Sequence, residues 1–345
     1  MYVAFILLLL LLISLFVAQR KAYTGLYYFD MTTTLPLRGA LALLILSHHL
    51  GQRTDIYPIS YFTAGIGAHI VAIFFFISGY GLCVSYITKG EGYFHGFLRK
   101  RLGKLLPKFI VLTLGMMLLY HFFGTSSLAL QTKNLMFGGI TPLPHSWFIY
   151  AIVYTYVSFY LCSLITTEVK KLGILFTISI LVYIIVAADF LHYPSYWYIT
   201  IICVNIGYFT AFYEKRITKF IDNNKILSYS LIVVSIVISY ILIKIIGGIA
   251  FSIWMSTQAF AVYIIIRTLK FFQWKWLCKI GKYSLDIYLI HGIPLKMGQY
   301  IGLENWSLWL FTYAVSIPCA IILNYIFDVF SRSKIFYKLN ITKVN

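Results

Sequence analysis

An arginine and a histidine stand eleven positions apart in one apolar stretch, LRGALALLILSHHL at residues 37–50. Eleven residues make almost three turns of an α-helix, so Arg38 and His49 share one face, about 16 Å apart along the axis. His48 points roughly 80° away from that face. Ionisable groups inside a membrane helix usually mark a pathway or a reaction site. The spacing therefore favours one cavity lined by Arg38 and His49, over an arginine that only reaches the headgroups and a histidine that only bonds a neighbouring helix.

The chemistry that these residue types support is group transfer to a hydroxyl. Histidine titrates near neutral pH, so His49 can take the proton of an attacking hydroxyl or carry an acyl group itself. A second motif, FLRKRLGKLLPKF at residues 97–109, places Arg101 and Lys104 three residues apart, on one face if a helix has begun there. Two cations on one face suit a phosphate-bearing ligand. Charge alone favours a simpler interpretation, a cluster that only fixes membrane topology.

These residues belong to a chain with the composition of a polytopic membrane protein. Of its 345 residues, 61% are hydrophobic and 11% are charged, whereas about 25% are charged in soluble domains. The five cysteines show no paired spacing, so a disulfide or cysteine-based zinc framework is not expected. The sequence predicts no sizeable soluble domain that could carry the net charge of +18. We therefore expect contact with membrane lipid and no nucleic-acid partner.

Apolar stretches of spanning length predict an all-α, polytopic transmembrane helix bundle of about eleven helices. The helices are expected near residues 2–18, 35–51, 66–87, 105–123, 146–165, 172–189, 196–213, 227–246, 249–268, 283–301 and 307–328. The first stretch has its positive charges, Arg20 and Lys21, behind it, whereas a cleavable signal peptide carries them in front. It is therefore predicted to be an uncleaved anchor.

Basic residues divide unequally between the connections of this helix map. Of the 28 lysines and arginines, 23 fall on one side and 4 on the other, and Arg38 completes the count. Positively charged connections stay in the cytoplasm. We therefore expect the N-terminus outside, the C-terminus in the cytoplasm, and the helix at 35–51 running from the cytoplasm outward.

Five segments, in order along the chain, resemble the acyltransferase-3 family, integral membrane O-acyltransferases that act on glycans. They are the Arg-x10-His pair Arg38 and His49, FFFISGYGL (74–82), RKRLGKLLP (99–107), HSWFIYAIVYTY (145–156) and GKYSLDIYLIH (281–291). This chain departs from the family pattern at Lys104, where relatives carry a second arginine, and at Ile152, where many carry glutamate. The family core has ten helices, so residues 1–30 resemble an additional N-terminal anchor and loop before a membrane domain at 31–345.

The resemblance implies an O-acetyltransferase in a bacterial cell membrane. The donor would be cytoplasmic acetyl-CoA, the acceptor a hydroxyl of an extracytoplasmic polysaccharide or lipid-linked oligosaccharide, and no metal is expected. Arg38 and His49 would be the catalytic residues, and Arg38, Arg101 and Lys104 would hold the phosphates and pantetheine of coenzyme A. The candidate acceptor contacts are Ser78, His145, Trp147 and His291.

Each acceptor candidate also has a structural interpretation. Ser78 follows an aromatic run and is more often a helix-packing hydroxyl than a nucleophile. His145 and Trp147 stand at an outer helix start, where aromatic residues commonly anchor a membrane protein. His291 falls within a predicted helix and is interpreted as a hydrogen-bonded core histidine. Asp286 lies about 140° from His291 around that helix, so it is expected to neutralise a nearby cation instead of orienting His291.

The alternative function is a transporter or flippase for a lipid-linked sugar. A proton-coupled carrier usually needs an intramembrane carboxylate relay, and the helix map leaves only Asp189, Asp286 and Asp328 in or near helices. The two halves also show no internal repeat of the kind that many carriers have. A non-catalytic scaffold would leave the Arg38 and His49 geometry unexplained, so an enzyme is the favoured class.

Overall fold

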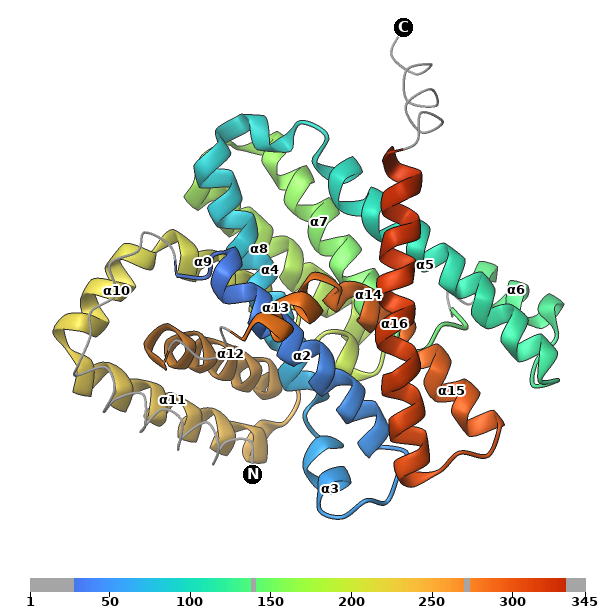
Figure 1. Ribbon diagram of the computed structural model, residues 1–345. Coiled ribbons are helices and arrows are strands. Elements are labelled where there is room, and N and C mark those ends of the chain that lie inside the picture. The colour runs from blue at the N-terminus through green and yellow to red at the C-terminus, as the bar shows by residue number, and fades with distance from the viewer. Residues whose placement is uncertain (1–27, 138–140, 270–273, 333–345) are drawn as a thin grey trace, which may run out of the picture.

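The computed structural model describes residues 28–137, 141–269 and 274–332, and these form an all-α bundle (Figure 1). The longer helices are α2 (Met31–Gly51), α4 (Gly67–Lys89), α5 (Phe97–Phe122), α7 (Trp147–Ile165), α8 (Val169–Ile185), α11 (Lys225–Ile246), α12 (Ile249–Leu269) and α16 (Asn305–Arg332). The shorter elements are α3 (Ile59–Thr63), η1 (Gly90–Phe94), α6 (Leu128–Phe137), η2 (Val186–Phe190), η3 (Ser195–Trp197), α9 (Cys203–Phe212), α10 (Glu214–Asn223), α13 (Lys275–Lys282), α14 (Ser284–Ile290) and α15 (Gly292–Tyr300).

Seven helical stretches of the described part are long and apolar enough to cross a membrane. They are Gly67–Phe94, Phe97–Phe122, Trp147–Ile165, Val169–Phe190, Lys225–Ile246, Ala250–Arg267 and Asn305–Phe330, with mean hydropathy from 1.3 to 2.5. Large apolar side chains cover their outward faces; Leu164, Ile245 and Leu310, for example, are all exposed. Such continuous apolar exposure fits lipid as the surrounding solvent. The chain is therefore an integral, multi-pass membrane protein.

The helix at residues 35–51 is confirmed as α2, but α2 is not among the seven apolar spans. Arg38 and the two histidines near its end lower its hydropathy, and the helix compensates by packing inside the protein. The side chain of Asp30 caps its first turn by accepting a hydrogen bond from the backbone N–H of Thr33 at 2.9 Å. Figure 1 shows α2 in the middle of the bundle, between α4 and α16.

Three predicted helix boundaries differ from the structure. Helix α5 begins at Phe97 and not at 105, because Pro107 is accommodated inside the helix and does not start it. The stretch at 196–213 is α-helical only from Cys203 to Phe212, since 3₁₀ and turn structure precede it. The stretch at 283–301 is divided at His291 into α14 and α15. The expected helix at 2–18 lies outside the described residues.

Glycines allow the central helices to approach each other at backbone distance, as is common in membrane proteins. A Cβ on Gly39 of α2 would lie 2.2 Å from the carbonyl oxygen of Leu277 in α13, and one on Gly281 would lie 1.9 Å from that of Leu35. No side chain fits at either position. The start of α2 is therefore locked against α13, in the segment that leads into α14.

A buried ion pair ties α5 to α14 and α16. The Lys108 ammonium lies 2.6 Å from the Asp286 carboxylate, and Asn324 donates a hydrogen bond to the other carboxylate oxygen at 2.9 Å. The expectation that Asp286 neutralises a cation is confirmed. The charge count, however, assigns Lys108 to a connection between helices, and this is wrong. Helix α5 begins at Phe97, so Lys108 lies inside the bundle.

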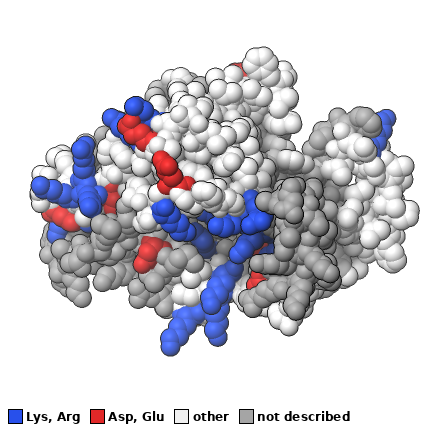
Figure 2. Space-filling model, turned by 90° about the horizontal axis from the view of Figure 1, so that it is seen from above, with Lys and Arg blue, Asp and Glu red and all other residues white. Residues whose placement is uncertain are grey.

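Basic side chains gather at the end of the bundle where α4 ends and where α5 and α8 begin (Figure 1). Figure 2 looks onto this end and shows groups of lysine and arginine side chains, with scattered acidic residues among them. The end is shared by connections that the sequence assigns to one side of the membrane. The N-terminal half of α2 points toward the same end in Figure 1, and the C-terminal half points away from it.

Candidate active site

Arg38 and His49 lie at the two ends of one interior stripe of α2. Ala42 and Ile45, which stand between them at helical spacing, are 0% and 2% exposed. His49 itself is buried, and Arg38 is half-buried. The stripe therefore faces protein along its length, as the spacing in the sequence predicts.

His48 faces a different neighbour. Its Nδ1 lies 3.1 Å from the carbonyl oxygen of Thr63, the last residue of α3. Its ring also packs on Gly67 at the start of α4, where an added Cβ would lie 2.2 Å from Nε2. His48 thus fills the junction between α2, α3 and α4, as expected of a packing residue.

The Arg38 end of the stripe opens into a cavity of about 540 Å³. Arg101 of α5 and Ser78 of α4 line the same cavity, so the structure brings together three residues that the sequence singles out. The Ser78 hydroxyl donates to the carbonyl oxygen of Phe74 one turn earlier, at 2.9 Å. Ser78 is therefore a helix-bonded hydroxyl at the cavity wall, and the two guanidinium groups provide the cavity's positive charge.

Aromatic side chains hold the Arg101 guanidinium in place. It donates a hydrogen bond to the Tyr93 hydroxyl at 2.8 Å. Its central carbon also lies 5.8 Å from the ring centre of Phe97 and 5.4 Å from that of Tyr156, both within the range of cation–π attraction. Arg101 is consequently oriented before any ligand arrives.

A second cavity of about 480 Å³ adjoins the first at Arg101. Lys104 lines it together with Lys89 and Lys100, so an exposed group of amines surrounds this entrance. Arg101, Ile152 and Tyr156 line both cavities, which makes the two spaces neighbours across one shared wall. Ile152 offers this wall an apolar side chain.

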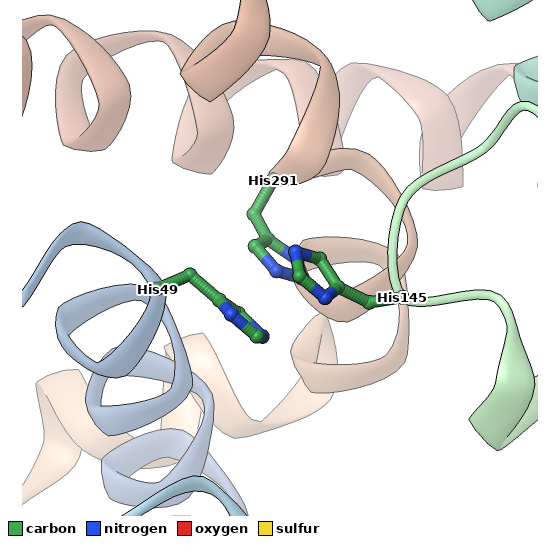
Figure 3. A group of neighbouring side chains, drawn as sticks. All are labelled: His49, His145 and His291. Atoms are coloured by element: carbon green, nitrogen blue, oxygen red, sulfur yellow. The ribbon is translucent and has the colours of Figure 1, made fainter. Parts of the chain in front are cut away.

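The His49 end of the stripe meets two other histidines (Figure 3). The ring centres of His49 and His145 are 3.5 Å apart, with an angle of 23° between the ring planes. His291 stacks beside both, 5.1 Å from His49 and 5.3 Å from His145. One nitrogen of each ring can be chosen so that all three lie within 4.8 Å of one another. Three segments that are remote in sequence thus meet in one imidazole cluster.

The loop before α7 presents His145 in an unusual backbone conformation. Its φ angle is 62°, in the left-handed region that residues other than glycine seldom adopt. The Tyr288 hydroxyl donates to the His145 carbonyl oxygen at 3.0 Å. The preceding residue, Pro144, packs on Gly292, where an added Cβ would lie 2.9 Å from the proline Cβ. Both contacts come from the α14–α15 region, so that region fixes the loop.

His291 occupies the break between α14 and α15, which corrects its expected place inside a continuous helix. Its Nδ1 lies 2.7 Å from the carbonyl oxygen of Tyr288, but its buried Nε2 has no hydrogen-bond partner among the described residues. His291 is thus a buried histidine with a hydrogen bond at one ring nitrogen and none to the described residues at the other. That nitrogen belongs to the histidine cluster.

One aromatic residue, Tyr288, connects the cavity with the cluster. Tyr288 and Phe148 both line the 540 Å³ cavity, and their ring centres are 4.8 Å apart. The Tyr288 ring is also 5.7 Å from that of His291. The sequence gives no reason to single out Tyr288 except its place three residues before His291, at helical spacing. The structure shows it to be the residue that touches both parts of the site.

Trp147 lies outside both parts of the site. Its ring contacts Tyr196 at 5.7 Å and Phe148 at 6.2 Å, edge to face in both cases. It lines neither of the two cavities that contain Arg101. This surrounding fits the structural interpretation of an aromatic residue at the start of a membrane helix.

A further cavity of about 620 Å³ lies among α9, α10, α11 and α12. Its walls are mostly apolar, and among the residues that the structure describes Arg216 is the one charged residue that lines it. No histidine borders it. The reactive side chains are therefore concentrated in the cavities at Arg101 and in the histidine cluster.

Comparison with known proteins agrees with the resemblance seen in the motifs. A family model described as an acyltransferase domain, of the acyltransferase-3 type, matches residues 37–325. The match begins at the residue before Arg38, ends inside α16, and contains every residue of the site described above. No curated protein and no solved structure matches the chain.

Proposed function

Because the chain belongs to the acyltransferase-3 family, we propose that it transfers an acetyl group from acetyl-CoA to a glycan hydroxyl. The acceptor is an extracytoplasmic polysaccharide or a lipid-linked oligosaccharide. One observation carries the proposal: a single buried stripe of α2 joins a cavity with two arginines to a cluster of three histidines. Arginine is suited to phosphate, and imidazole is suited to a hydroxyl proton.

The donor enters from the basic end of the bundle. Lys89, Lys100 and Lys104 surround the outer cavity and attract the phosphates of coenzyme A. Arg101 binds at the shared wall and Arg38 in the inner cavity, and the pantetheine arm fills this cavity toward Tyr288, the lining residue that contacts His291 of the cluster. The stripe measures about 16 Å from Arg38 to His49. This length brings the thioester toward the histidine cluster.

The transfer step needs one base and no external reactant. The acceptor hydroxyl gives its proton to Nε2 of His49 while its oxygen attacks the thioester carbonyl carbon. The carbon–sulfur bond breaks, and the departing thiolate takes a proton from the His49 imidazolium. The products are the acetyl ester and free coenzyme A, so the proton balance closes at His49. Gln52 orients the ring through a contact of 3.3 Å from its Oε1 to Nδ1.

The basic end of the bundle faces the cytoplasm in this proposal. The charge division in the sequence, 23 basic residues against 4, supports that orientation. Acetyl-CoA is a cytoplasmic metabolite, so its binding cavity has to open on that side. His49 then lies toward the outer half of the bundle, where an exported or lipid-linked sugar reaches it.

The flippase alternative receives less support from the carboxylates. A proton-coupled carrier needs an intramembrane acid that gains and loses protons as the carrier moves. Asp286 is held by Lys108 and by Asn324. An acid held by a cation and an amide is better suited to fixing helices than to a proton relay.

The test uses the full chain, purified in detergent and given acetyl-CoA that is radiolabelled in the acetyl group. Membrane extracts of the expressing cells serve as the acceptor source, and labelled product is counted after the free donor is removed. We expect label in the glycan fraction with the unmodified protein, and at least about 100-fold less with His49→Ala, because loss of a general base costs about 10²–10⁴ in rate. Arg38→Lys is expected to fall between the two, since it keeps the charge and loses the planar guanidinium.

His48→Ala is the matched control. It removes the same side chain from the neighbouring position of α2, and it should keep most of the activity. An inactive His48→Ala protein beside an active His49→Ala protein, at equal yield and monodispersity, would refute the assignment of the base. Movement of a lipid-linked sugar without any acetylation would refute the enzyme and favour the flippase.

A further inference from the structure

Five of the eight histidines lie in one region, far more than a single general base requires. His48 is 4.7 Å from His49 between ring centres, and His69 stands at the start of α4, half-buried, with a buried Nδ1 that has no hydrogen-bond partner among the described residues. The central three, His49, His145 and His291, have nitrogens within 4.8 Å of one another. We propose that these three side chains form a binding site for a divalent transition-metal ion, for which Zn²⁺ is the best-fitting ion.

The donor set selects the class of ion. Three imidazoles and no carboxylate suit Zn²⁺ and related borderline ions, whereas Mg²⁺ and Ca²⁺ require oxygen ligands. Three protein ligands leave one position of a tetrahedron for water or a hydroxyl. Zinc–nitrogen bonds of about 2.0–2.1 Å place the ligand nitrogens about 3.4 Å apart. The distances between the ligand nitrogens must therefore shorten by more than about 1 Å, to about 3.4 Å, when the ion binds.

The hydrogen bonds around two of the rings are those of metal-binding histidines. Such a histidine donates one ring N–H to a carbonyl or carboxylate, which fixes the ring and leaves the other nitrogen as a ligand. His291 contacts the Tyr288 carbonyl at 2.7 Å through Nδ1, and its Nε2 is buried without a partner among the described residues. A carbonyl only accepts, so Nδ1 carries the proton and Nε2 carries the lone pair.

His49 has the same arrangement. Its Nδ1 lies 3.3 Å from Oε1 of Gln52, while the amide nitrogen of Gln52 faces the carbonyl oxygen of Ala64 at 3.5 Å. The amide therefore presents its oxygen to the ring, and the Nε2 lone pair of His49 is left for the cluster. Two of the three ligands are thus held in the tautomer that a metal ion needs.

His145 is the ligand that has to move. Its ring makes no hydrogen bond to the described residues and stacks face to face on His49, so the lone pairs of the two rings run parallel and do not converge. A turn of the His145 ring about its χ2 angle ends this stacking, and the His291 ring, whose plane is 17° from that of His49, must tilt as well for the three lone pairs to converge. No hydrogen bond to the described residues has to be broken, because the His145 carbonyl, and not its ring, makes the contact that anchors this loop.

The site is built for reversible binding. Imidazole binds a metal ion in its neutral form, so the three ligands bring no negative charge to offset the ion, and Arg53 and Lys296 are near enough to His145 to repel positive charge there. These nearby cations oppose a second positive centre, so we expect an ion that exchanges with the solution, unlike the permanent zinc of a four-ligand structural site. The proposed function adds a consequence, which rests on His49 being the base. An ion on Nε2 of His49 occupies the lone pair that must accept the hydroxyl proton, so Zn²⁺ should inhibit transfer.

Binding is measured separately from activity. The full chain is purified, stripped with EDTA, and titrated with Zn²⁺ by calorimetry and with Co²⁺ by visible absorption, which reports tetrahedral coordination. We expect one ion per chain in the unmodified protein. His291→Ala should weaken binding by more than about 100-fold, since loss of even an outer contact to a metal ligand costs about 10- to 100-fold. His145→Gln provides a second ligand variant if His291→Ala does not accumulate.

His121→Ala is the control, because His121 is exposed at the end of α5, away from the cluster. It should bind one ion as tightly as the unmodified protein. Absence of Zn²⁺ binding in the unmodified protein would overturn the site, as would equal affinity in His291→Ala, His145→Gln and the control. Transfer activity in the metal-free protein would then still support the proposed function.

The two proposals fail in different ways. Tight, cluster-dependent binding that leaves the transfer rate unchanged keeps the metal site and refutes the role of His49 as base. Transfer that is absent without metal and restored by Zn²⁺ keeps the site and refutes competition between ion and proton. Inhibition that EDTA reverses, and that follows the measured binding curve, supports both.

Discussion

The contact between Gly292 and Pro144 gives the sharpest test of how the histidine cluster is assembled. In Gly292→Ala, the new Cβ would lie 2.9 Å from Cβ and 3.1 Å from Cγ of Pro144. Carbon atoms pack best at about 3.5–4.0 Å, so the proline must move by roughly 0.5–1 Å. Proline has no rotamer that would release the clash. The displacement therefore passes to the backbone of the next residue, His145.

The expected size of the effect follows from that displacement. Overpacking of this kind costs about 1–3 kcal/mol of stability, and a misplacement of about 1 Å at a reacting group can cost about 100-fold in rate. We expect Gly292→Ala to accumulate, to melt at a lower temperature, and to lose about ten- to 100-fold in acetyl transfer. The assays are a thermal melt in detergent and the radiolabelled transfer measurement.

The matched control is Gly115→Ala in α5. This glycine is also helical, but an added Cβ meets no atom within 4 Å. The control should match the unmodified protein in rate and equal or exceed it in stability, because alanine favours a helix by about 1 kcal/mol over glycine. A Gly292→Ala protein that is destabilised yet transfers at the full rate would refute the reasoning, since His145 would then not depend on this contact.

The remaining predictions concern the donor site, the buried ion pair and the orientation. Arg101→Ala should raise the KM for acetyl-CoA more than it lowers the melting temperature, while Lys104→Arg should be tolerated or mildly beneficial; unchanged donor kinetics in Arg101→Ala would leave the cluster a topological role only. Lys108→Met should cost about 3–5 kcal/mol in a thermal or denaturant assay, because the Asp286 charge is left buried, and the double variant with Asp286→Leu should recover most of it; a double variant no better than the single one would contradict this. A reporter that is active only in the cytoplasm should be active when it is fused after Asn345. Activity of a reporter that works only outside the cytoplasm, fused at the same place, would reverse the predicted membrane orientation.

The sequence was sufficient to predict the pair on α2. Helical spacing is a local property, so Arg38 and His49 could be assigned to one face, and His48 to another, without any tertiary information. The same reasoning explains why most of the long apolar helices were predicted. Hydrophobic length reports a span directly, since a membrane leaves a chain few other ways to satisfy its backbone.

The parts that could not be predicted depend on contacts between distant segments. Hydropathy does not report the interruption at His291, because α14 and α15 are both apolar and the break changes backbone geometry alone. The left-handed conformation of His145 is likewise imposed by tertiary contacts, from Tyr288 and Gly292, that no local pattern encodes. The meeting of the three histidines follows from those two features. It therefore became visible only in the structure.

Lys108 illustrates the opposite kind of error. Its neighbours in sequence are the basic residues of a connection, so charge counting grouped it with them. The extra helical turns at the start of α5 move it into the bundle, where Asp286 receives it. A proline inside a membrane helix gives no reliable boundary, because neighbouring helices can satisfy the freed backbone groups.

The backbone contacts between α2 and α13 hold α2 in a fixed position. Arg38 and His49 stand on the same helix, so the helix itself sets their separation, which cannot adapt to the size of a ligand; Gly39 and Gly281 in addition leave no room for α2 to slide along α13. In the proposed reaction, the distance from Arg38 to His49 corresponds to the part of the donor between its phosphates and its thioester. This part is the same in every acyl-CoA. The acyl chain itself extends past His49 and is not limited by this distance. Selection of acetyl over longer groups therefore falls to the space around His145 and His291, and enlarging that space should broaden the range of acyl groups transferred without changing the affinity for coenzyme A.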